Sequence, residues 1–554
     1  MTAGAKIGHP MSGSPQMMHL RTPAATLAAL LLSSTAVLAQ ATHPETGELL
    51  AEDQSFTYRM LDEWKSIDPQ LVEETAGYHA VRDLFEGLYN SAPDGTIEPG
   101  VALSHEVSED NKTYTFTLRQ DAKWSNGDPV TANDFVYAWR RAADPETASN
   151  YSWYVELTSM ENAAEIIAGE MAPEELGVRA IDDYTLEVTL TESLPYFPAM
   201  TAYATLFPAH RATIEAHGTE WTRPENIVGN GAYTLTEHVI GERHTRSKSD
   251  TYWDAANTII TDTTGLVIND SNQAMTRYFD GEVDMVEPVP AGQYPELEAE
   301  YPDQAHSVPR LCTYYYALNQ SEGGIDPLKD PDVRKALSLA VDRDVIVDQI
   351  LKGGQEPAYS FAHWATAGYD MPDIDTAAMT QAERDEMARE LLGDTELPTL
   401  ELIYNTSDDH KQIATVISQM WKQKLGVDTT LANYEWQTYL DVRGGQNFDV
   451  SRSAWCSDYN EASSFLDLMT SNNSNNDGRF SNPEVDRLME EARTAEDPQP
   501  IYTEVEQILA EETAIIPIYH YANAFMLKSD VEGWPFENAE NNWYSRELYR
   551  VASE

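Results

Sequence analysis

The chain has 554 residues, a length that fits about two to four domains. Its 92 Asp and Glu residues far outnumber its 36 Lys and Arg residues, and the resulting net charge of −56 argues against nucleic acids or anionic membranes as partners. Because 42% of the residues are hydrophobic and 10% are aromatic, we still expect packed cores with the excess carboxylates at the surface.

This excess of carboxylates predicts strong self-repulsion at low salt. Salt at 1 M shortens the Debye length to about 3 Å, which screens that repulsion. We therefore interpret the chain as an acidic protein from a halophilic source. The alternative is an ordinary acidic protein with no such adaptation.

The first 41 residues are typical of a secretory signal peptide. They contain two basic residues and no acidic one, residues 24–39 are uncharged and mostly Ala and Leu, and Ala-Gln-Ala at 39–41 fits the cleavage pattern. We expect cleavage near Ala41 and export to a bacterial periplasm. The apolar run is too short for a good membrane span and no other segment is suitable, so the mature chain is predicted not to be inserted in the membrane.

Between residues 113 and 190 the sequence predicts strands and a helix. Apolar residues occupy alternate positions in 113–119 and again in 185–190, which is the period of a strand with one buried face. Between these strands, Thr-Ala-Asn-Asp at 131–134 precedes apolar residues at helical spacing, which predicts a helix that begins there.

The second half shows further helix boundaries. Pro follows both Asp330 and Asn482, as is common at the first helical position, and Thr-Gln-Ala-Glu at 380–383 is a capping box whose helix should stop at Gly393. The Asn- and Ser-rich segment 471–478 predicts a surface loop. The irregular mixture of strands and helices indicates an α/β or α+β fold with several lobes.

The common catalytic motifs are absent from the sequence. There is no Gly-rich phosphate loop ending in Lys-Ser or Lys-Thr, no His-Glu-x-x-His helix and no Gly-x-Ser-x-Gly elbow. Three adjacent residues, Asp408, Asp409 and His410, could suggest a metal site, but neighbours in one loop rarely converge on one ion, so we interpret them as a solvated turn. We predict no enzymatic activity, no cofactor and no metal.

Cys312 and Cys456 are the two cysteines of the chain. In an exported protein a lone pair most often forms a disulfide, and two unrelated buried thiols are the alternative. Close to the second cysteine lie Arg452, Trp455 and Asp458. The Arg and Asp residues are either an ordinary ion pair or a site for a zwitterion, in which the carboxylate binds an ammonium group and the guanidinium binds a carboxylate.

Seven motifs follow one another along the mature chain. They are Arg82-Asp-Leu-Phe-Glu-Gly-Leu88, Asp121-Ala-Lys-Trp-Ser-Asn-Gly127, Val130-Thr-Ala-Asn-Asp-Phe-Val-Tyr137, Asn226-Ile-Val-Gly-Asn-Gly-Ala-Tyr-Thr-Leu235, Cys312-Thr-Tyr-Tyr-Tyr316, Tyr404-Asn-Thr-Ser-Asp408 and Trp455-Cys-Ser-Asp-Tyr-Asn-Glu461. In order and spacing they resemble the periplasmic oligopeptide-binding proteins of ABC importers, bacterial extracellular solute-binding protein family 5, nearly from end to end.

The resemblance implies an α/β fold of the clam-like type II periplasmic binding class, with two lobes and an extra small domain. Its implied parts are lobe I at 42–86, 211–311 and 526–554, the small domain at 87–210, and lobe II at 312–525. The chain would cross between the lobes near residues 311 and 525, which would form the hinge. A ligand held between the lobes would favour the closed form, because only that form contacts it from both sides.

The resemblance also implies roles for individual side chains. Asp458 matches the residue that fixes the α-ammonium group of the peptide. Arg452 and Arg443 match residues that neutralise the carboxylate of short peptides, and His410 matches one that meets the carboxylate of longer peptides. Trp436 matches an aromatic wall of a side-chain pocket.

Further matching positions would pair with the peptide backbone or lie beside it. They are Glu73, Tyr151, Tyr315, Trp455 and Cys456. The same resemblance places a disulfide between Cys312 and Cys456. Two positions depart from some relatives: Leu351 stands where they have Lys, and Ala317 stands where they have an acidic residue. These departures leave the preferred peptide length and any preference for basic side chains open.

The implied function is non-enzymatic. A monomer would capture peptides of a few residues in the periplasm and deliver them to membrane permease subunits driven by separate ATPase subunits. The alternatives are the same fold dedicated to murein (cell-wall) peptides, a peptide chemoreceptor, and, from a different class, a secreted hydrolase.

Overall fold

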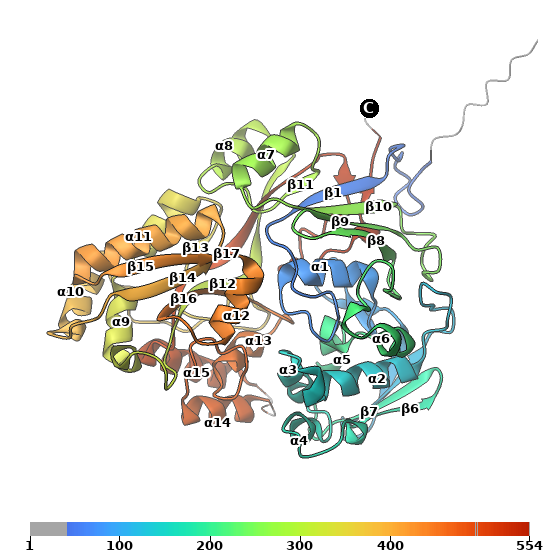
Figure 1. Ribbon diagram of the computed structural model, residues 1–554, viewed down its shortest axis with the longest axis horizontal. Helices are drawn as coiled ribbons and strands as arrows, with labels where there is room; N and C mark the ends of the chain where they lie inside the picture. The colour runs from blue at the N-terminus through green and yellow to red at the C-terminus, as the bar shows by residue number, and fades with distance from the viewer. Residues whose placement is uncertain (1–40, 195, 494, 496, 553–554) are drawn as a thin grey trace, which may run out of the picture. The chain divides into compact units, whose positions relative to one another are not determined.

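A computed structural model describes residues 41–552 except 195, 494 and 496 (Figure 1). The predicted signal peptide, residues 1–41, lies outside the described residues except for Ala41, and its cleavage stays a prediction. Within the described part of the chain, no helix combines the length and the apolar character that a membrane crossing needs.

The framework is an eleven-stranded mixed sheet. Its strands are β1 (Ser55–Met60), β8 (Tyr233–Val239), β9 (Arg243–Lys248), β10 (Asp262–Val267), β11 (Met285–Val286), β12 (Ala305–Leu318), β13 (Glu356–Pro357), β14 (Leu400–Asn405), β15 (Thr429–Tyr434), β16 (Val450–Cys456) and β17 (Ile515–Leu527). The order is β15-β14-β16-β12-β17-β11-β1-β10-β9-β8, and β13 pairs with β17 as a branch.

The two long strands β12 and β17 join the halves of this sheet. In Figure 1 they run between the group β14–β16 and the group that contains β1 and β10. They pair antiparallel over residues 305–309 and again over 313–317, and their register shifts between Pro309 and Thr313. This irregularity lies beside residue 311, where one hinge crossing is predicted.

A separate four-stranded antiparallel sheet has the order β4-β5-β7-β6. Its strands are β4 (Ala102–Val107), β5 (Thr113–Leu118), β6 (Val178–Asp182) and β7 (Thr185–Thr189), and two small pairs elsewhere are β2 (Tyr89–Ser91) with β3 (Ile97–Pro99) and β18 (Val531–Glu532) with β19 (Tyr549–Arg550). The strands β5 and β7 confirm the two predicted strands. Helix α2 (Ala132–Ala143) confirms the helix predicted between them and packs against β6.

The other α-helices of the described residues surround the sheets. They are α1 (Thr75–Leu84), α3 (Ser152–Leu157), α4 (Ala163–Ile167), α5 (Phe197–Met200), α6 (Arg211–His217), α7 (Ser271–Phe279), α8 (Tyr294–Glu300), α9 (Pro331–Leu339), α10 (Gln381–Leu392), α11 (Asp408–Leu425), α12 (Trp436–Gly444), α13 (Ser463–Leu466), α14 (Pro483–Ala492) and α15 (Gln499–Glu512). The predicted boundaries are confirmed: Asp330 and Asn482 cap α9 and α14, and α10 has the capping box and ends at Gly393.

Two buried clusters hold most of the core. The larger one unites side chains of the main sheet, such as Phe56 and Tyr58, with side chains of the four-stranded sheet and its helix, such as Phe116 and Trp139. The other lies under β14, β16 and helices α9–α11 and includes Trp421.

Two predictions about polar segments were wrong in part. Residues 408–410 do not form a solvated turn, because they make the first turn of α11 and His410 is buried. Segment 471–478 is a loop as predicted, but Asn473 and Asn476 are buried. The Asn476 side chain donates to the carbonyl of Phe480 at 2.7 Å, which shows how side-chain amides satisfy the backbone of a buried polar loop.

Candidate ligand-binding cavity

A cavity of about 350 Å³ is lined by residues 58–62 and 452–458 together with residues from the segments 73–82 and 405–410. All ten side chains that sequence reasoning assigned to peptide binding line it. They are Glu73, Tyr151, Tyr315, His410, Trp436, Arg443, Arg452, Trp455, Cys456 and Asp458. Positions from six separate stretches of the sequence therefore meet at one place.

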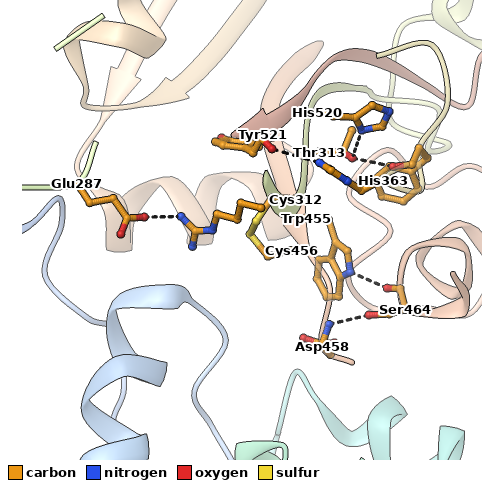
Figure 2. The surroundings of a disulfide bond; sticks show 12 residues. Glu287, Cys312, Thr313, His363, Trp455, Cys456, Asp458, Ser464, His520 and Tyr521 are labelled. Carbon is orange, nitrogen blue, oxygen red and sulfur yellow. Dashed lines mark hydrogen bonds and ion pairs between the residues drawn. A yellow bond between two sulfur atoms is a disulfide. The ribbon is translucent and has the colours of Figure 1, made fainter. Parts of the chain in front are cut away.

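The predicted disulfide is present. Cys312 and Cys456 are directly opposed residues of the antiparallel strands β12 and β16, and a disulfide joins them beside the cavity (Figure 2). Figure 2 shows Asp458 and Tyr521 on opposite sides of this bond. The disulfide thus anchors the strand whose two ends carry the charged groups of the cavity.

Strand β16 presents a free backbone edge to the cavity. Its ladder with β12 runs over the whole strand, but its ladder with β14 contains only Val450 and Ser451. Residues 452–456 therefore have a strand partner on one side only, and all five line the cavity. Such an edge offers backbone donors and acceptors to an incoming extended chain.

At one end of this edge, Asp458 holds a carboxylate with unused hydrogen-bonding capacity. Ser464 fixes this segment, because its Oγ accepts the Asp458 N–H at 2.7 Å and its carbonyl accepts the Trp455 indole N–H at 2.6 Å (Figure 2). Asp458 Oδ2 is buried and has no hydrogen-bond partner among the described residues. A buried carboxylate in this condition favours a cationic partner.

The electrostatics agree with that geometry. The pKa of Asp458 is raised to about 8, mainly by burial and in part by the nearby Glu540 carboxylate, whereas a hydrogen bond from Tyr203 opposes this rise. Arg82 lowers this pKa. Among the described residues, Arg452 makes no ion pair with Asp458, so the interpretation of these two side chains as an ordinary ion pair was wrong.

Arg452 lies within β16 at the other end of the free edge. Its Nη1 donates to Asn405 Oδ1 at 3.3 Å, its Nη2 donates to the Tyr521 hydroxyl at 3.0 Å, and its guanidinium lies 4.7 Å from the centre of the Tyr314 ring. Its Nε is buried without a hydrogen-bond partner among the described residues. The cavity therefore carries opposite charges at its two ends.

Arg443 is held by a partner that sequence reasoning missed. Its Nε pairs with Asp477 Oδ1 at 3.1 Å, and Ser453 Oγ donates to the other oxygen of Asp477 at 2.7 Å. Asp477 belongs to the loop 471–478, whose polar composition gave no signal of this contact. Asn405, Tyr203 and Tyr521 were missed for the same reason, because only the fold brings them here.

The other predicted residues form walls or are already paired. The rings of Tyr151 and Trp455 stack with their centres 6.4 Å apart, and Trp436 stacks on Tyr439 at 6.0 Å. Glu73 pairs with Lys65 at 2.7 Å. His410 lies 5.6 Å from the Tyr314 ring centre, and Tyr315 is buried in the wall.

Burial and the charge of Arg452 hold the pKa of His410 well below its usual range, so the imidazole is neutral. Leu351, which stands where some relatives have Lys, lines the cavity. Its neighbour Lys352 is exposed and does not line the cavity. The far end of the cavity therefore gains no cation from these positions.

The family model for bacterial extracellular solute-binding proteins, family 5 (middle), matches residues 96–477. The periplasmic murein peptide-binding protein MppA of Escherichia coli is 41% identical over 95% of this chain and 98% of its own length. The periplasmic oligopeptide-binding protein OppA of Escherichia coli is likewise 41% identical, over the same shares of both chains. The structure of Haemophilus influenzae OppA in complex with the peptide RPPGFSPFR superposes with a TM-score of 0.88 at 37% identity, covering 91% of this chain and 100% of that one.

Fold and cavity together define a periplasmic binding protein of the two-lobed type II class with an extra domain. The chain belongs to family 5 of the bacterial extracellular solute-binding proteins, and it is a binding protein, not an enzyme.

The conformation can be placed as well. The unliganded open form of MppA superposes with a TM-score of only 0.65, although it is as similar in sequence, at 41% identity, as the other MppA structure that scores 0.88. Since sequence similarity is equal, the difference reflects the arrangement of the parts. The present structure is therefore more similar in arrangement to the peptide complex of OppA than to the unliganded open form of MppA.

Proposed function

We propose that this chain is the periplasmic peptide-binding component of an ABC importer. It captures oligopeptides of a few residues and delivers them to membrane permease subunits that separate ATPase subunits drive. One observation carries the proposal: a buried carboxylate oxygen of Asp458 without a partner stands at the end of the unpaired edge of β16. A peptide supplies the two things that are missing there, an ammonium group and a row of backbone donors and acceptors.

The proposed binding mode follows from distances along the strand. At about 3.3 Å per residue, Arg452 lies about 13 Å from Cys456, and Asp458 follows two residues later. An extended tripeptide spans about 10 Å. A peptide anchored at Asp458 therefore extends along β16 toward Arg452 while its backbone pairs with the strand, and its carboxyl end comes nearer to that guanidinium with each added residue.

Backbone pairing gives affinity that does not depend on the peptide's sequence. Tyr151, Tyr315, Trp436 and Trp455 would form the walls around its side chains. Arg443 and His410 would lie beside the carboxyl end of short and longer peptides, and Glu73 and Cys456 beside its backbone.

The lobes are part of the same proposal. Lobe I would comprise 42–86, 211–311 and 526–554, lobe II would comprise 312–525, and the small domain 87–210. The register shift between β12 and β17 near residue 311 supports a hinge at that crossing. Closure would carry side chains of lobe I over a peptide that lies on β16.

The cellular setting is also a proposal. Residues 1–41 would direct export and be removed near Ala41, and the mature monomer would work in the periplasm. We attribute the net charge of −56 to adaptation to high salt, because dense counterions would screen the repulsion among surface carboxylates.

The proposal is tested by titrating tetra-alanine and N-acetyl-tetra-alanine into the purified protein in a calorimeter. Acetylation removes the cation that the Asp458 carboxylate would bind, so the acetylated peptide should bind at least on the order of a hundredfold more weakly. Equal affinities would refute the assignment of Asp458. Mass spectrometry of the recovered peptides should find them intact, whereas cleavage would identify a hydrolase.

A narrower ligand is the second candidate, because the murein peptide-binding protein MppA is as similar as OppA. In this case L-Ala-γ-D-Glu-meso-diaminopimelate would displace bound tetra-alanine at far lower concentration than other tripeptides do. Comparable competition by unrelated tripeptides would exclude the dedicated murein function.

A further inference from the structure

Two other guanidinium groups of the cavity lining already have carboxylate partners within the chain. Arg310 pairs with Glu287 at 2.8 Å, and Arg443 pairs with Asp477 at 3.1 Å. These side chains line the cavity, and both pairs are mostly shielded from solvent. Neither guanidinium therefore needs the carboxylate of a ligand to neutralise its charge.

Arg452 has a less obvious partner, which it reaches through an amide. Asn405 accepts from Arg452 with its Oδ1 at 3.3 Å and donates from its Nδ2 to Asp62 Oδ2 at 3.4 Å. The other Asp62 oxygen accepts from Asn269 at 3.3 Å. Asp62, Asn405 and Arg452 all line the cavity and are 8%, 2% and 7% exposed, so this relay is desolvated.

The Asp62 side chain acts in this relay as an ionised carboxylate and not as a neutral carboxylic acid. Burial raises its pKa to about 6, whereas the charge of Arg452 lowers it, and Asn405 lowers it through a hydrogen bond. The carboxylate is therefore mostly ionised at neutral pH. It follows strand β1 in the chain, whereas Asn405 and Arg452 belong to β14 and β16, so the relay joins segments far apart in the sequence.

Other titratable groups act on the members of this relay or lie beside it. Arg59 carries the second guanidinium nearby, and its field lowers the pKa of Asp409, which burial raises. His410 is neutral, and Glu435 adds a further negative field at Asp62. A peptide carboxylate placed at Arg452 would therefore compete with the Asp62 carboxylate for the same guanidinium.

The amino end of the cavity differs. Arg82 is the remaining guanidinium of the lining, and it lowers the pKa of both Asp458 and Glu540. Burial raises the pKa of both carboxyl groups, and one oxygen of Asp458 has no hydrogen-bond partner among the described residues. The amino end of the cavity thus has an unpartnered carboxylate oxygen and no internal counter-ion in contact with it, whereas Arg452 is linked to an internal carboxylate and keeps only its Nε without a hydrogen-bond partner among the described residues.

We propose that Asp62 is a specificity-determining residue that supplies Arg452 with an internal carboxylate, so that the cavity does not select for a free carboxyl terminus near Arg452. The ligands it fits are peptides with a free amino terminus whose carboxyl group is neutral or lies beyond Arg452, as in peptides longer than three residues. This inference rests on the proposed function, because it concerns the far end of the same bound peptide.

The test compares trialanine with trialanine amide by calorimetry at neutral pH. The unaltered protein should bind the two with similar affinity. Asp62→Asn removes the internal carboxylate, so the affinity for trialanine should rise relative to the affinity for trialanine amide by on the order of tenfold. This factor corresponds to the low end of the coupling energies measured for close charge pairs. The exposed Asp250, which lies outside the cavity, provides the matched control Asp250→Asn, in which the ratio should stay unchanged.

The ratio of the two affinities is informative because any effect of the substitution on folding or closure acts on both peptides alike. A preference of the unaltered protein for the free acid by tenfold or more would overturn the inference even if Asp62→Asn does not fold. An unchanged ratio in a folded Asp62→Asn would overturn it too. Failure of every free-amino peptide to bind would instead overturn the proposed function, and this inference with it.

Discussion

The charge of Asp458 leads to a prediction about protons. Burial raises the pKa of Asp458 to about 8 in this structure, so its carboxyl group is mostly protonated at pH 7 while the cavity holds no cation. A bound ammonium group stabilises the ionised form and lowers that pKa. Peptide binding at pH 7 should therefore release close to one proton from Asp458.

The pH dependence has a definite sign. Because the ligand needs the ionised carboxylate, affinity should fall as pH falls below about 8, by up to about tenfold per unit, until the lower pKa of the complex is reached. Above about pH 8 the α-ammonium group itself deprotonates, so affinity should fall again. We expect an optimum near pH 8.

The assay is calorimetry of tetra-alanine binding in two buffers that differ in ionisation enthalpy. The difference in measured enthalpy gives the number of protons released. Asp458→Asn should abolish that release and weaken binding by on the order of a hundredfold or more, because the ammonium group then lacks its counter-ion. Burial also raises the pKa of the neighbouring Glu540, to about 7, so Glu540→Gln serves as the matched control and should retain most of the release.

This reasoning would be refuted if the unaltered protein released no proton at pH 7. Near-normal affinity and unchanged proton release in Asp458→Asn would refute it as well. A loss of affinity with unchanged proton release would show that another carboxylate titrates, and it would move the anchor away from Asp458.

Three further outcomes are expected. Replacing Cys312 and Cys456 by Ser removes a link between residues 144 positions apart and should lower the free energy of unfolding by about 2–5 kcal/mol. Urea titration under non-reducing conditions measures this loss, and a loss below about 1 kcal/mol would contradict the prediction. The melting temperature of the mature protein should rise steeply between millimolar and molar NaCl, and a flat profile would contradict the halophilic interpretation. Small-angle scattering should show a smaller radius of gyration with tetra-alanine than without it, and equal radii would argue against closure about the hinge.

Local structure was predictable because its causes are local. A capping box at 380–383, a stop at Gly393 and alternating apolar residues at 113–119 each depend on neighbours within a few positions, and the structure confirms them. The order and spacing of motifs likewise predicted the family. That resemblance also singled out ten residues that meet in the cavity.

Contacts between distant segments were not predictable in this way. Nothing near Asp62 in the sequence indicates that it meets Arg452 through Asn405, and nothing in the loop 471–478 indicates that Asp477 neutralises Arg443. Burial of polar side chains in that loop was missed for the same reason.

The sequence by itself therefore determined the class of fold, the family and the positions of one candidate anion and one candidate cation. Only the tertiary structure decided which of those charged side chains already has a partner of opposite charge within the protein. The strength of an ion pair depends on separation and desolvation, and both arise when strands far apart in the chain pack around one cavity.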